Sequence, residues 1–211
     1  MNNQLTVWQT FIGMIIKPLY TFQHLQNDDR AARKGLWVLL LVLGTYTFIL
    51  SIFITHDYPA MAPSILPISV EDLYRYQVWY QGPLFIVATL VLTGLLVLLA
   101  KMKGQAAGFT VVFARVRLAT AVPFALTTMA VELVIAILVL VGVFQPLEIL
   151  GWLAGEGAWF ANAYQLVGVL WIIGLLALTA RLTLGVRWWL AIILGVVLAV
   201  IYGIPIGLFI R

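Results

Sequence analysis

The chain has 211 residues, of which 64% are hydrophobic and 9% are charged, and its formal net charge is +4. A soluble domain carries roughly 25% charged residues, and so short a chain cannot hide this much apolar surface from water. The composition therefore excludes a water-soluble fold and predicts an integral membrane protein. The absence of cysteine also excludes disulfides, thiolate metal sites and cysteine nucleophiles.

The first 35 residues are predicted to form a cytoplasmic segment that does not cross the membrane. Apolar residues recur there at steps of three and four: Leu5, Trp8, Ile12, Ile15, Leu19 and Phe22. This spacing predicts an amphipathic helix, which Pro18 divides into two pieces. The helix either lies in the membrane interface or packs on the bundle, and the sequence leaves both possibilities open.

Five later stretches are apolar over the roughly 20 residues that a spanning helix needs. They are residues 36–55, 78–100, 118–144, 159–180 and 188–210. Because backbone groups in hydrocarbon must bond within their own segment, each stretch is predicted to be a helix. The expected fold is an all-α membrane protein, with five transmembrane helices in residues 36–211 and an interfacial helix in residues 1–35. Prolines and glycines predict loops at 56–77 and 145–157.

Basic residues alternate from one connection to the next. Ten of the twelve lysines and arginines fall before the first span, between the second and third, or between the fourth and fifth. Only Arg75 and Arg211 fall on the other side. Since cytoplasmic loops carry the excess of Lys and Arg, the N-terminus is predicted to be cytoplasmic and the C-terminus outside.

Glu132 is the most informative polar residue of the spans. It lies about 22 Å beyond Arg117 at the rise of an α-helix, and an ionised carboxylate at that depth is costly. With Thr128 and Pro123 it forms a candidate intramembrane polar site, and Asn162, Tyr164 and Gln165 are candidate partners. Glu132 either handles a proton or ligand, or ties two helices together as a neutral acid. The second interpretation is favoured because no other ionisable group is expected beside it.

Small residues in the fifth span recur every four positions. The row is Ala191, Gly195, Ala199, Gly203 and Gly207. Such a row forms a groove in which another helix backbone can approach closely. Packing within one chain is favoured, and self-association or a membrane-protein partner is the alternative.

The cytoplasmic side is predicted to present a basic face. Its residues are Arg30, Arg33, Lys34, Lys101, Lys103, Arg115 and Arg117. These side chains either attract anionic lipid or only set the topology. Because they flank apolar spans, nucleic acid is not an expected partner.

The sequence contains none of the motifs that indicate common enzymes. It has no phosphate-binding GxxxxGK[ST] loop, no HExxH metal pair and no GxSxG turn. His24 and His56 are predicted on opposite sides of the membrane, so they cannot share a metal. No enzymatic activity, cofactor or metal is expected.

The sequence also resembles the bacterial branch of the Ypt-interacting-protein family, also called the Yip-one domain family. The resemblance rests on the proline–aromatic segment 17–22, on Gly108-Phe109 followed by Pro123, and on Trp159-Phe160 at the entry to the fourth of five spans. It implies a multi-pass inner-membrane protein with a cytoplasmic N-terminus and no catalytic residues. Eukaryotic members bind Rab-type GTPases, but their longer polar N-terminal region is not matched here, so that role is not expected.

The expected function is that of a non-enzymatic membrane-organising or binding protein. The alternative is a small transporter or channel subunit with Glu132 in its pathway.

Overall fold

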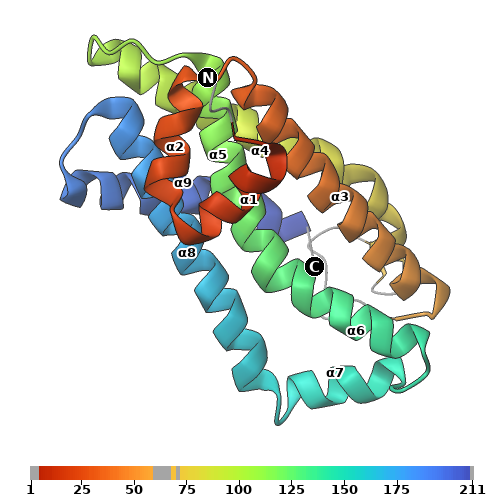
Figure 1. The fold of residues 1–211 in the computed structure, drawn as a ribbon. Helices are drawn as coiled ribbons and strands as arrows, with labels where there is room; N and C mark the ends of the chain where they lie inside the picture. The colour runs from red at the N-terminus through yellow and green to blue at the C-terminus, as the bar shows by residue number, and fades with distance from the viewer. Residues whose placement is uncertain (1–4, 59–67, 70–71, 210–211) are drawn as a thin grey trace.

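A computed structural model describes residues 5–58, 68–69 and 72–209, which form helices and no strand (Figure 1). The elements are α1 (Val7–Ile16), α2 (Pro18–His24), the 3₁₀ turn η1 (Leu25–Asn27), α3 (Ala31–Thr55), α4 (Leu73–Met102), α5 (Phe109–Phe124), the π-helical turn η2 (Ala125–Met129), α6 (Ala130–Leu140), α7 (Pro146–Ala154), α8 (Ala158–Leu184) and α9 (Trp188–Phe209).

Five helical stretches are long and apolar enough to cross a membrane. They are α3, α4, the continuous stretch Phe109–Leu140 (α5, η2 and α6), α8, and α9 as far as Ile206. The protein is therefore an all-α membrane bundle, as its composition predicts. Large side chains on the outer faces of these helices, such as Leu41, Val87 and Ile192, are more than half exposed, as lipid-facing residues are.

The N-terminal segment packs on the bundle and exposes apolar side chains as well. Lys17 ends α1 and Pro18 begins α2, which confirms the division expected at this proline. α1 lies across α3 and α5 (Figure 1) and buries Thr10 and Met14 against them. Trp8 and Ile16 point away and are 64% and 68% exposed. The two expected positions of this helix are thus combined, since one face packs on the bundle and the other is free to meet lipid.

The third spanning helix begins nine residues earlier than expected, at Phe109 in place of residue 118, and ends at Leu140 in place of residue 144. The helix extends past the expected boundary because Arg115 and Arg117, at which that boundary was placed, do not end it. Both arginines lie inside the bundle. The first span likewise starts at Ala31 in place of residue 36, which brings Lys34 into the helix.

The connection at 145–157, which was expected to be a loop, contains helix α7. Pro146 occupies the first helical position, which suits its fixed φ. Gln145 and Glu148 form a capping box in which the Glu148 side chain accepts from the Gln145 N–H at 3.0 Å. The capping contacts thus stabilise a helix here despite the glycines, which disfavour one. Half of the other expected loop, residues 59–67 and 70–71, lies outside the described residues.

Candidate functional site

One spanning helix, α5–η2–α6, carries three ionisable side chains at different depths. Arg115 and Arg117 lie in its first half and Glu132 in its second. At about 1.5 Å per residue, Arg117 lies roughly 12 Å from the first residue of α5, and Glu132 about 22 Å farther. Because ionisable groups in spanning helices are costly, their partners indicate what each group does.

Arg117 is 1% exposed and only partly hydrogen-bonded. Its Nη1 donates to the carbonyl oxygen of Phe85 on α4 at 3.1 Å, and its guanidinium lies 5.4 Å from the ring centre of Phe113. Its Nε and Nη2 have no partner among the described residues. A buried cation is therefore held by one carbonyl dipole and one aromatic face, and no described carboxylate pairs with it.

Arg115 fixes the N-terminal segment to the bundle. It is 3% exposed, and its Nε and Nη2 donate to the carbonyl oxygen of Phe22 at 3.2 and 2.9 Å. Nη2 also donates to Oε1 of Gln26 at 3.1 Å. These contacts join the start of the third span to the end of α2 and to η1. Arg115 therefore has a clear structural role, which its sequence position among other basic residues did not suggest.

Glu132 belongs to a polar cluster with members on three helices. Its carboxyl group lies near enough to the Tyr46 hydroxyl on α3 to interact with it electrostatically. Tyr46 is 1% exposed and accepts a hydrogen bond from Nε2 of Gln77 on α4 at 3.2 Å. Nearby, Nε2 of Gln81 donates to Oγ1 of Thr47 at 2.9 Å. Two hydrogen bonds therefore join α4 to α3, and Tyr46 brings this polar cluster next to Glu132 on α6.

Of the three partners expected for Glu132 on the fourth span, Tyr164 lies near it. Asn162 and Gln165 are exposed, whereas Tyr164 is near enough to interact electrostatically with Glu132. Tyr58, just beyond the end of α3, is 2% exposed and lies near enough to Glu132 to interact with it electrostatically. Burial raises the pKa of Tyr58, and the nearby Glu132 carboxylate raises it further.

A π-helical turn separates the arginines from Glu132. Pro123 lies at the end of α5, and the five residues of η2 follow directly after Phe124. The hydroxyl of Thr127 donates to the Pro123 carbonyl oxygen at 2.8 Å. This bond gives a carbonyl oxygen beside the irregular turn a hydrogen-bond partner. Thr127 is buried, whereas Thr128 is only partly buried. The residue of this pair that faces the bundle is thus Thr127, although Thr128 was the candidate.

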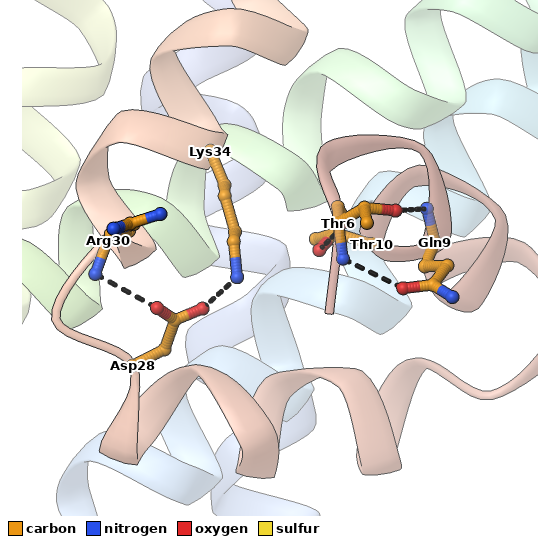
Figure 2. Close-up of polar contacts among 6 residues, drawn as sticks. All are labelled: Thr6, Gln9, Thr10, Asp28, Arg30 and Lys34. Atoms are coloured by element: carbon orange, nitrogen blue, oxygen red, sulfur yellow. Dashed lines mark hydrogen bonds and ion pairs between the residues drawn. The ribbon is translucent and has the colours of Figure 1, made fainter. Parts of the chain in front are cut away.

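The seven residues expected to form one basic face are divided by the fold. Arg30, Arg33, Lys101 and Lys103 are exposed, and Lys103 Nζ donates to the carbonyl oxygen of Leu184 at 3.0 Å. Lys34, Arg115 and Arg117 are buried, so they cannot belong to an exposed face. Lys34 forms an ion pair with Asp28, which also accepts from the Arg30 N–H at 2.9 Å (Figure 2). The expectation of seven exposed cations was therefore wrong for three of them.

Two neighbouring hollows lie between α1 and α3. The apolar groove has a volume of about 480 Å³ and is lined by Val7, Trp8, Phe11, Trp37, Val38, Leu40 and Leu41. The basic pocket has a volume of about 370 Å³ and is lined by Leu5, Thr6, Val7, Arg30, Arg33, Lys34 and Trp37. The two share Val7 and Trp37. An apolar hollow thus adjoins one that carries cations.

Thr6 shapes the basic pocket at the start of α1. Its hydroxyl accepts from the Gln9 N–H at 3.1 Å, and the Gln9 side chain accepts from the Thr6 N–H at 2.8 Å (Figure 2). This capping box sets the first turn of α1. It leaves Thr6 lining the same pocket as Arg33.

The small-residue row of α9 lies partly against α8. A Cβ added at Gly195 would come within 2.7 Å of the Ile173 carbonyl oxygen and 2.8 Å of the Ala177 Cβ. Ala191 and Gly195 are buried, Ala199 and Gly203 are partly buried, and nothing lies within 4 Å of a Cβ at Gly203. For Gly207, the last of the row, the structure describes only its place in α9. The close approach is therefore an intramolecular α8–α9 contact at the first part of the row.

Sequence reasoning missed Tyr46, Gln77 and the hollows between α1 and α3. Tyr46 and Gln77 are polar residues within or beside long apolar stretches, and that pattern alone was a usable signal. The hollows had no signal, because they depend on how α1 lies against α3.

No group of three or more His, Cys, Asp or Glu side chains gathers as metal ligands would within the described part of the chain. No family model, curated protein or solved structure matches the chain.

Proposed function

We propose that the protein is a non-enzymatic inner-membrane protein of the Yip-one type that binds anionic phospholipid, with its N-terminus in the cytoplasm and its C-terminus outside. The observation that carries this proposal is that the apolar groove adjoins the basic pocket between α1 and α3, with Val7 and Trp37 lining both. A phospholipid has the same division, with an apolar chain joined to a charged headgroup.

The charges around the pocket favour an anionic headgroup. Lys34 is neutralised by Asp28, but the guanidinium groups of Arg30 and Arg33 are exposed and make no ion pair with a described carboxylate. Each basic residue near an anionic membrane surface contributes about 1 kcal/mol to the attraction. The pocket therefore favours a headgroup with net negative charge over a zwitterionic one.

The aromatic lining supports the same occupant. Trp8 and Trp37 are 64% and 50% exposed, and tryptophan side chains favour the level of the headgroups. Placed there, the groove would receive an acyl chain while Arg30 and Arg33 face the phosphate. The orientation follows the same logic, since this end carries the excess of Lys and Arg.

The test is native mass spectrometry of the full chain extracted from membranes that contain phosphatidylglycerol and phosphatidylethanolamine. We expect the wild type to retain phosphatidylglycerol selectively, and a double variant with Arg30→Gln and Arg33→Gln to lose that selectivity several-fold. Arg75→Gln is the matched control, because Arg75 is also an exposed arginine but lies at the other end of the bundle. Equal retention by all three proteins would refute the proposal.

A second candidate function, proton-coupled transport, is favoured by the Gln77–Tyr46–Glu132 cluster. Neighbouring polar side chains on three helices resemble the relays of transporters, and the π-turn before α6 is a feature often found at functional sites. Under this hypothesis Glu132→Gln abolishes proton-coupled flux in proteoliposomes. If flux is unchanged in Glu132→Gln, Glu132 acts only as a helix tie.

A further inference from the structure

A third hollow lies where the start of α5 meets the end of α8. It has a volume of about 180 Å³ and shares no lining residue with the hollows between α1 and α3. Its lining includes Gln26, Gly108, Arg115 and Thr183. The space corresponds to about six water molecules at ~30 Å³ each, which is enough for a small polar group.

The N-terminal turn of α5 contributes backbone donors to this cavity. Gly108 is the N-cap residue and provides no side-chain hydrogen bond, and the first backbone bond of the helix joins the Val112 N–H to the Gly108 carbonyl oxygen. The preceding N–H groups therefore lack intrahelical acceptors. Together with the helix dipole they favour an anion at this position.

Two buried side chains add donors independently of the helix terminus. Arg115 is 97% buried, and its Nη1 makes no hydrogen bond with a described residue, while Nε and Nη2 hold Phe22 and Gln26. Thr183 is 94% buried, lines the cavity, and its hydroxyl has no partner among the described residues. A buried polar atom without a partner costs about 1–3 kcal/mol, which indicates an occupant that accepts hydrogen bonds.

The charge of the cavity indicates which occupant it takes. Arg115 is the one charged residue among the described residues that line it, so an acceptor with negative charge meets a cation, backbone N–H groups and a hydroxyl. We propose that this Arg115–Thr183 cavity binds a phosphate group, supplied either by a phospholipid headgroup or by free inorganic phosphate. The site is separate from the α1–α3 lipid site and does not depend on it.

Thr183→Val is the sharpest test, because it removes a hydroxyl that has no protein partner and keeps the side-chain shape. We expect its thermal stability without phosphate to equal or exceed that of the wild type, because the lost hydroxyl has no protein partner, and its affinity for phosphate to fall several-fold. Thr179→Val is the matched control. Thr179 lies one turn earlier on α8, is fully buried, and bonds only to the Leu175 carbonyl oxygen at 2.8 Å.

A second variant, Gly108→Asp, places a carboxylate at the N-cap of α5. A Cβ at this position meets nothing within 4 Å, and Asp is a favoured N-cap, so the variant is expected to fold. Its carboxylate would satisfy the helix N–H groups itself. We expect it to abolish the response to phosphate while the α1–α3 site still selects anionic lipid.

The measurement is thermal unfolding of the full chain in neutral detergent, with inorganic phosphate titrated against chloride at equal ionic strength, and separately with short-chain phosphatidylglycerol against a neutral glycolipid. Stabilisation by inorganic phosphate identifies free phosphate as a ligand, and stabilisation by the phospholipid alone identifies a headgroup. Either result supports the proposal if Thr183→Val and Gly108→Asp weaken it and Thr179→Val does not. No stabilisation by either ligand, or equal stabilisation in every variant, overturns it.

Discussion

The two halves of the third spanning helix treat buried charge in different ways. In the first half, Arg115 and Arg117 depend chiefly on backbone carbonyl oxygens, those of Phe22 and Phe85. In the second half, Glu132 interacts electrostatically with a side chain, the Tyr46 hydroxyl, which accepts a hydrogen bond from Gln77. The π-turn η2 lies between the halves.

The length of an ionisable side chain decides how it finds a polar partner inside a helical bundle. Arginine has a long side chain with five donors, so it can reach a carbonyl oxygen of another segment and join the two. A glutamate has a short side chain and needs a donor brought to it by a neighbouring helix. Arg115 is therefore expected to stabilise the docked N-terminal segment, whereas Arg117, with Nε and Nη2 unpartnered, is expected to contribute little to stability.

The largest effect is expected for Arg115→Ala. The substitution removes the donors for Phe22 and Gln26, and hydrogen bonds to charged groups contribute ~1.5–3 kcal/mol each, so a loss of about 3 kcal/mol is expected. Thermal unfolding in detergent measures the loss, and limited proteolysis should show cleavage within residues 5–27. Arg33→Ala, which removes an exposed arginine, is the control. An N-terminal segment as protected as in the wild type would contradict this role.

An intermediate effect is expected for Tyr46→Phe. The change keeps the ring, which packs 5.2 Å from the Phe124 ring centre, and deletes the hydroxyl between Gln77 and Glu132. Leaving a buried polar group unsatisfied costs about 1–3 kcal/mol. Thermal unfolding of Tyr46→Phe is compared with that of Tyr20→Phe, whose side chain is 50% exposed. Combining Tyr46→Phe with Glu132→Leu should recover part of the loss, and strict additivity would show that the two residues are not coupled.

The smallest effect is expected for Arg117→Met. Replacing a buried, incompletely paired charge by an apolar side chain of similar length is often neutral or stabilising, so a change within about 1 kcal/mol is expected. Unfolding in detergent measures the stability. A loss as large as that of Arg115→Ala would remove the contrast between the two arginines and show that Arg117 has an unrecognised stabilising partner.

The class of fold and the approximate spans could be predicted from the amino-acid sequence alone. A run of about 20 apolar residues predicts a spanning helix, because hydrocarbon offers no hydrogen bonds to the backbone and the segment must satisfy its own. The division at Pro18 was equally local, since it depends on one residue that lacks an N–H. The functional expectations, including the Yip-one resemblance and the absence of an activity, stay predictions.

Which charged residues lie inside the bundle depends on how the helices pack, and the sequence did not predict it. Arg115 and Arg30 look alike in the sequence, yet one is 3% exposed and holds the chain end, while the other faces outward. The partner of Glu132 was equally unpredictable, because Tyr46 lies 86 positions earlier in the chain. Burial and pairing depend on how distant helices pack, whereas span formation depends on each segment and the lipid alone. The hollows between α1 and α3, and between α5 and α8, follow from that packing.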